Sequence, residues 1–219
     1  MLESRAVNLT LQTQLLPDGD QAKKLSATMR AFNTAADWLA GEAFRLKTAN
    51  KVELQQLYYR QLRDDFGISA QMTIRCIAQV CEAYGRDKSI RPRFRKYASV
   101  PYDQRLMSFK GVDRVSLLTL EGRTIVPVVM GKHQSERFNG KHGQCDLHRR
   151  KDGRWFLLVS VEAPDGEPIA STDFIGVDFG VVNLAVDSDG QMHMGDDVER
   201  TRKHYEKVKR SLQRNGMCQ

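Results

Sequence analysis

Asp178 is the residue of this sequence whose setting most plainly suggests chemistry. It ends the apolar run Phe174-Ile175-Gly176-Val177, and Gly180 follows two positions later. An ionised carboxylate among apolar residues is costly unless it binds a cation or accepts several hydrogen bonds. Glycines on both sides allow a phosphate or another backbone to come close. We therefore expect Asp178 to be a metal ligand; the alternative is a hairpin turn in which Asp178 only caps the bend.

Two other patterns with an aspartate in this setting fit less well. Asp178-Phe179-Gly180 matches the magnesium-binding tripeptide of protein kinases, but no Gly-rich loop, strand lysine or H-R-D loop precedes it, which excludes a kinase. Residues 175–183 also resemble the phosphate-binding first hairpin of actin-like ATPases. That hairpin lies near the start of a much longer fold, whereas 41 residues (219 minus 178) follow Asp178 here. An ATPase fragment is therefore a less favoured alternative.

Basic residues with interleaved aromatics suggest a second kind of site. Between positions 86 and 110 there are eight basic residues against two acidic ones, with Phe94, Tyr97 and Tyr102 among them. Such a stretch can bind phosphates and stack bases, although charge runs are more often solvated surface. The predicted nucleic-acid contacts in this segment are Arg91, Arg93, Arg95, Lys96 and Tyr97.

A second basic segment is a predicted helix at about 197–214. It carries seven basic residues against Glu199 and Glu206, and leaves an apolar seam of Tyr205, Val208 and Leu212. We expect the seam to pack on the domain while the charges follow a nucleic-acid backbone. The predicted contacts are Arg202, Lys203, Lys207, Arg210 and Arg214.

Composition limits the class of protein. The chain has 219 residues, 34 Lys plus Arg against 27 Asp plus Glu, and 41% hydrophobic residues, which excludes a collagen and wholesale disorder. The longest apolar stretch, at 155–161, is far shorter than the roughly 20 residues of a membrane helix. The four cysteines form no C-x-x-C pair, so we expect neither a zinc ribbon nor a disulfide scaffold. With no secretory signal after Met1, a cytoplasmic protein with no membrane partner is expected.

Periodicity divides the chain into three parts. Period-two alternation predicts a strand at 6–13, and recurring apolar residues predict helices at about 20–46, 52–65 and 70–85, the last ended by Gly85. Short strands follow, with a hairpin of 144–150 and 155–162 around an Asp-Gly turn. Pro127 predicts an edge strand or a bulge. The expected fold is mixed α/β: a small β-barrel from residues 1–19 and 86–165, a helical insertion at 20–85, and a separate segment at 172–219.

The order of these parts resembles one family. Residues 175–190 look like the first RuvC motif of the TnpB-type (OrfB family) proteins, transposon-encoded relatives of the type V CRISPR effectors. Leu15-Leu16-Pro17 followed by the helix with Asn33 resembles that family's N-terminal half, as does the segment 91–103. Residues 205–216 resemble its arginine-rich bridging helix.

The resemblance implies a wedge-like β-barrel holding a helical recognition insertion, followed by an RNase H-like (RuvC) nuclease domain. In that family a guide RNA directs the protein to target DNA, and three carboxylates hold two Mg²⁺ ions for cleavage. Asp178 matches the first, catalytic carboxylate.

The later Glu and Asp, and the family's zinc ribbon, have no counterpart in residues 1–219. We therefore expect an incomplete RuvC domain in a truncated, prokaryotic, cytoplasmic protein that does not cleave DNA alone, with a second polypeptide as one way to complete it. The alternative is a nuclease-dead, guide-dependent DNA-binding repressor or RNA-binding module. The acids that follow the first hairpin are expected to be solvated or capping groups: Asp187, Asp189, Asp196, Asp197 and Glu199.

Overall fold

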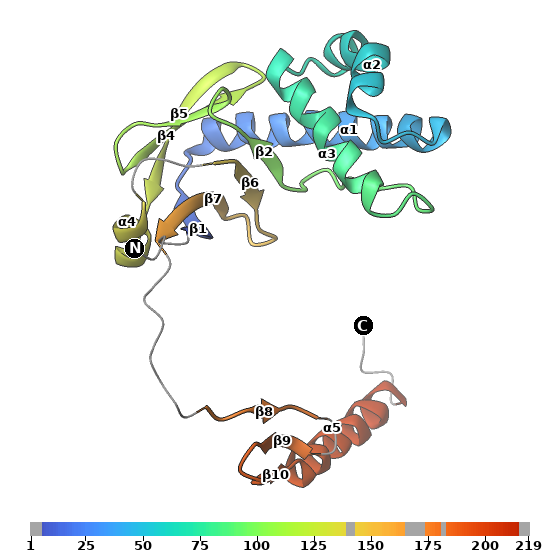
Figure 1. The fold of residues 1–219 in the computed structure, drawn as a ribbon, viewed down its shortest axis with the longest axis vertical. Coiled ribbons are helices and arrows are strands. Elements are labelled where there is room, and N and C mark those ends of the chain that lie inside the picture. The colour runs from blue at the N-terminus through green and yellow to red at the C-terminus, as the bar shows by residue number, and fades with distance from the viewer. Residues whose placement is uncertain (1–5, 139–142, 165–173, 181–182, 215–219) are drawn as a thin grey trace, which may run out of the picture. The chain divides into compact units, whose positions relative to one another are not determined.

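The chain forms two compact units, Met1–Asp165 and Gly166–Gln219, which we describe separately. In the computed structural model, shown in Figure 1, residues 6–138, 143–164, 174–180 and 183–214 are described. None of the described helices is both long and apolar enough to cross a membrane.

The first unit is built on a curved, nearly closed antiparallel sheet (Figure 1). Its seven strands have the order β2-β6-β7-β1-β5-β4-β3. The strands are β1 (Ala6–Leu15), β2 (Val100–Tyr102), β3 (Met107–Phe109), β4 (Arg114–Thr119), β5 (Gly122–Val129), β6 (Cys145–Arg149) and β7 (Trp155–Pro164). The predicted mixed α/β class with a barrel-like sheet is confirmed.

Strand β1 lies at the centre of this sheet. It pairs along its full length with β7, from Ala6 opposite Pro164 to Leu15 opposite Trp155, and its last two residues also pair with β5. Leu11, Thr13 and Leu15 point into the core and are buried, as period two requires. The burial of these alternate residues fixes the register, because a one-residue slip would move them all to the other face.

Three helices lie between β1 and β2 in the chain: α1 (Gly19–Leu46), α2 (Lys51–Phe66) and α3 (Ala70–Arg86). Asp18 begins α1 with a capping box, in which its side chain accepts from the Gln21 amide and Gln21 accepts from the Asp18 amide. Gly67 ends α2 in the left-handed region, and the Ser69 side chain caps α3. The apolar stripe of α1 is buried, as its spacing predicts.

Two expectations for this unit are wrong. Gly85 does not end α3, because the helix continues to Arg86. A glycine inside a helix costs about 1 kcal/mol, and the burial of Tyr84 offsets this cost. Pro127 lies in β5, between β1 and β4, rather than in an edge strand. The Pro127 carbonyl accepts from the amide of Leu16 (2.9 Å), which lies one residue past the end of β1. The proline nitrogen, which has no hydrogen to donate, therefore lies beside the end of β1, where a donor is not needed for strand pairing.

The short helix α4 (Lys132–Arg137) follows β5, and the second unit holds the remaining elements. Strands β8 (Val177–Asp178), β9 (Asn183–Asp187) and β10 (Met192–Met194) form an antiparallel sheet in the order β10-β9-β8, and helix α5 (Asp196–Arg214) follows. The strand expected at 174–178 is reduced to two residues. Strand β10 was not predicted from the sequence. Helix α5 begins and ends within one residue of its predicted bounds.

Candidate nucleic-acid interface

A basic hollow in the first unit brings together the segment 95–98 and the tip of the β6–β7 hairpin. Its volume is about 580 Å³. The lining residues are Arg95, Lys96, Tyr97, Ala98, His148, Arg149, Arg150 and Lys151. Five of these carry a permanent positive charge and none is acidic, so the hollow attracts anions.

Arg149 is the most firmly held cation of this basic hollow. Its guanidinium carbon lies 5.1 Å from the centre of the Tyr97 ring and 5.4 Å from that of Trp155. One of its nitrogens also donates to Ser26 Oγ (3.4 Å). Contact with two ring faces holds the charge in one place by cation–π attraction. Trp155 itself is buried, while Tyr97 is 43% exposed and can offer a face to a base.

The tip of the β6–β7 hairpin adds a second arginine, Arg150, to the basic hollow. The Arg150 guanidinium lies 4.1 Å from the centre of the Phe156 ring. The nearby acid, Asp152, is paired with Arg154 at 2.6 Å, and hydrogen bonding from Arg154 lowers the pKa of that carboxyl. Asp152 is thus held mainly by Arg154, which does not line the hollow, with a smaller electrostatic interaction with Arg150.

Arg91 joins the basic segment to α1. Its guanidinium donates to the backbone carbonyl (3.0 Å) and to the carboxylate (3.2 Å) of Asp37. It also lies against Gly41, where a side-chain carbon would sit 3.4 Å from the guanidinium carbon. The charge of Arg91 is therefore already partnered, and the residue positions the segment.

Asn33 provides a second anchor for the same segment. Its side-chain nitrogen donates to the carbonyl of Ala98 (2.9 Å) from a fully buried position on α1. Arg93, Arg95 and Lys96, which lie between the two anchors, are exposed. The helical insertion thus holds the cationic segment in place while leaving its charges in solvent.

The predicted basic residues of α5 are all exposed, but they differ in their partners. Arg202 is paired with Glu199 (2.6 Å) and Glu206, and Lys203 with Glu199 (3.5 Å). Hydrogen bonding from Arg202, together with the nearby positive charges, lowers the pKa of Glu199 to about 2. Within the described part of the chain, Lys207, Arg210 and Arg214 have no ion pair, so their charges are available.

Asp178 lies in β8, opposite Val186 of β9. It is exposed, as is every described residue from 174 to 180, so burial does not force its carboxylate to bind a cation. Asp187, the last residue of β9, accepts from the backbone amides of Asp189 and Gln191 and is a capping group, as expected. The described residues contain no group of three or more His, Cys, Asp or Glu able to hold a metal. A single carboxylate does not fit a two-metal site, and we derive no cleavage step from it.

The sequence predicted the residues on one side of the basic hollow but not those on the other. The predicted contacts in the hollow are Arg95, Lys96 and Tyr97. The hairpin prediction assigned no nucleic-acid contact to Arg149, Arg150 and Lys151. Their signal was three consecutive basic residues before an Asp-Gly turn. Nothing in the sequence places that turn beside residues 95–98, since the pairing of β2 with β6 does this.

No protein-family model matches this chain, and no curated protein matches it.

Proposed function

We propose that this chain is a TnpB-like protein that binds a guide RNA through its barrel unit. The observation that carries the proposal is the basic hollow, which combines five permanent cations with an exposed tyrosine ring and contains no acid. Phosphates would be bound by Arg95, Lys96 and Lys151, and an unpaired base would stack on Tyr97. Since these contacts are to backbone and ring faces, the sequence of the DNA target would be read by base pairing with the RNA.

The proposal includes target DNA binding but not cleavage by the 219-residue chain. Asp178 is the counterpart of one magnesium ligand, and the described residues supply no second and third carboxylate near it. When bound, Mg²⁺ would activate a water and stabilise the leaving oxygen, which requires the complete carboxylate set. Purified protein with guide and matched DNA should therefore bind the duplex and leave it uncut in Mg²⁺. Metal-dependent nicking would contradict this part.

The second unit supports a protein partner that completes the RuvC-like domain. Among its described residues no hydrophobic side chain is buried, and Phe174 and Phe179 are 83% and 79% exposed. Several large apolar side chains exposed in one short segment favour an interaction site there. A nuclease-dead repressor would use the same surfaces, and guide-directed DNA binding without any added polypeptide would favour it.

Charge reversal tests the RNA-binding proposal. In Arg95→Glu/Lys151→Glu, two phosphate contacts are lost from the basic hollow, so co-purified RNA should fall and the salt dependence of binding should flatten by about 1 per residue. The matched control is Lys23→Glu/Arg60→Glu, which reverses one arginine and one lysine exposed on α1 and α2. Equal losses in the two double variants, or no RNA binding by the parent chain at about 50 mM salt, would refute the proposal.

A further inference from the structure

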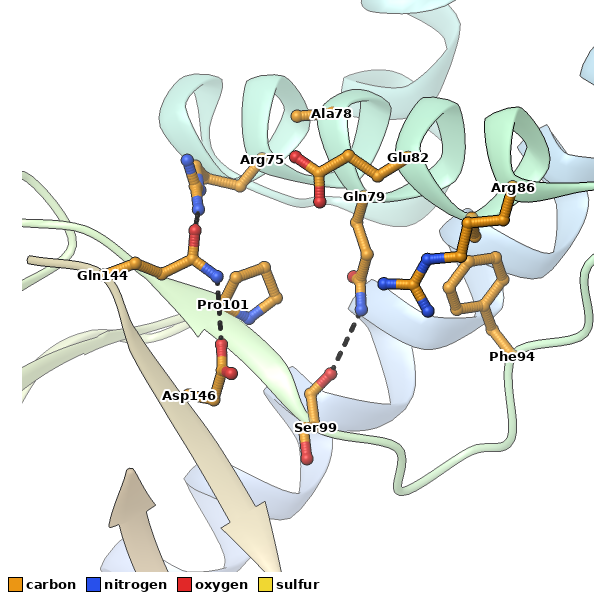
Figure 2. A pocket seen from close by; sticks show the side chains of 11 residues that line it. Arg75, Ala78, Gln79, Glu82, Arg86, Phe94, Ser99, Pro101, Gln144 and Asp146 are labelled. Carbon is orange, nitrogen blue, oxygen red and sulfur yellow. Dashed lines mark hydrogen bonds between the residues drawn. The ribbon is translucent and has the colours of Figure 1, made fainter. Parts of the chain in front are cut away.

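A second hollow in the first unit, of about 320 Å³, lies between α3 and strands β2 and β6 (Figure 2). The polar residues that α3 contributes are Arg75, Gln79, Glu82 and Arg86, which are spaced by four, three and four positions and share one helix face. None of these four residues contributes to the basic hollow.

Internal hydrogen bonds link some of the groups that line this polar hollow. Arg75 donates to the side-chain oxygen of Gln144, whose nitrogen donates to Asp146 (3.2 Å). Gln79 donates to the Ser99 carbonyl (3.4 Å), and these contacts are drawn in Figure 2. Two buried atoms here, Arg75 Nε and Gln79 Oε1, have no hydrogen-bond partner among the described residues, so a donor and an acceptor are left for a ligand.

Two charged groups that line the polar hollow, Glu82 and Arg86, also lack partners among the described residues. Glu82 and Arg86 are four positions apart, in the order that favours an ion pair on a helix. Comparable pairs elsewhere are closed, such as Asp20 with Lys24 at 2.8 Å. Neither Glu82 nor Arg86 forms a hydrogen bond or ion pair with another described residue, and both line the cavity.

The charge balance of the polar hollow restricts its ligand. Arg75 and Arg86 are matched by Glu82 and Asp146, so the lining is neutral overall and does not favour a phosphate or a metal cation. An unpaired carboxylate and an unpaired guanidinium that line the same cavity instead suit a neutral ligand with paired donors on one edge and paired acceptors on another. Among the nucleobases, guanine has this pattern: N1–H and the N2 amino group donate, while O6 and N7 accept.

We propose that the polar hollow binds an unpaired guanine base of a single-stranded nucleic acid. Glu82 accepts from N1–H and the amino group, and Arg86 donates to O6 and N7. Phe94, which also lines the cavity, offers an apolar surface to the base. Its position is fixed, since its backbone amide donates to Asp37 Oδ1 (3.0 Å). The proposal rests on the proposed RNA binding and adds a base preference to it.

Short oligouridines with one central guanine, adenine, cytosine or inosine test this site in the full 219-residue chain. A bidentate contact of this kind predicts that the guanine strand binds about 5- to 10-fold more tightly than the adenine or cytosine strand, at the low end of direct readout because both side chains are exposed. Inosine lacks the amino group and should bind less tightly than guanine. Ribose and deoxyribose series should show the same preference, since the contacts are to the base.

Variants separate this proposal from general RNA binding. Glu82→Gln should abolish the guanine preference, measured as the ratio of the affinities for the guanine strand and for plain oligouridine, and Arg86→Lys should reduce this ratio. The matched control, Glu162→Gln, changes an exposed glutamate on β7 and should keep it. Equal affinity for all four strands would overturn the guanine site and leave RNA binding standing. Failure to bind any strand, at about 50 mM salt, would overturn both.

Discussion

Asn33 shows how one buried amide can control a functional surface. Its nitrogen donates to Met29 within α1 and to Ala98 at the edge of the basic hollow. In Asn33→Ala the Ala98 carbonyl loses its partner, and we expect the free energy of unfolding to fall by about 1–2 kcal/mol. Chemical denaturation measures this loss. Thr34→Ala, at the neighbouring exposed position, should change the value by less than about 0.5 kcal/mol; a similar loss in both variants would contradict the anchoring role.

Glu199 gives a prediction for pH. Its carboxyl pKa is lowered from 4.5 to about 2 by hydrogen bonding from Arg202 and by the nearby charges of Arg202 and Lys203. A lowered folded-state pKa means that the contribution to stability is complete above pH 4.5 and is lost as the pH falls toward 2. An NMR titration of the Glu199 carboxyl should show this low midpoint in dilute salt.

Arg202→Gln should move that midpoint back toward 4.5. Arg210→Gln removes the same charge from α5 without removing an ion pair of Glu199, and it should shift the midpoint much less. An ordinary midpoint in the parent chain would show that the pair is open in solution, as exposed ion pairs often are.

The candidate site was predictable only as far as it depends on local composition. Charge and aromatic spacing were sufficient to find Arg95, Lys96 and Tyr97. They were insufficient for Arg149, whose position between Tyr97 and Trp155 depends on strand pairing between distant segments. The apolar residues before Asp178 suggested a buried carboxylate, because an apolar strand is usually covered. The apolar residues next to Asp178 are exposed instead.

At the scale of single elements, capping residues explain why the helices were predicted to within about one residue. Asp18, Gly67 and Ser69 mark boundaries through local hydrogen bonds, which sequence patterns capture well. Asp18→Ala removes the side-chain acceptor for the Gln21 amide. We expect a loss of about 1 kcal/mol in the free energy of unfolding.

Asp18→Asn is the informative control for that substitution, because asparagine is an equally good N-cap and should retain most of the stability. Thermal unfolding of both variants compares them directly. If alanine and asparagine cost the same, the capping box would not contribute. Strand elements were less predictable than helices, as β10 and the shortened β8 show, because strand pairing depends on partners outside the local sequence.

The two units of the molecule differ in how they are stabilised. Every buried hydrophobic side chain of the described residues lies between Leu11 and Val161, so the first unit has a core and the described part of the second has none. Three short strands without a covered face are marginal on their own. We predict that amides of β8, β9, β10 and α5 exchange with solvent hydrogen much faster than those of β1 and β7.

Hydrogen exchange followed by mass spectrometry on the intact chain measures this difference. A partner that covers the second unit should slow exchange in β8–β10 and leave β1 unchanged, which gives the control within one experiment. Equal protection of the two units in the isolated chain would contradict the prediction.

The position of β1 has a consequence for synthesis on the ribosome. Leu11 pairs with Val159, 148 positions later in the chain. At about 5–20 residues per second, translation takes about 7–30 s to reach that partner. The helices α1 to α3 need only local contacts and can fold during this interval. The nascent barrel therefore carries an unpaired central strand while its helical insertion is already complete. A chaperone that protects this strand would act between the synthesis of β1 and that of β7.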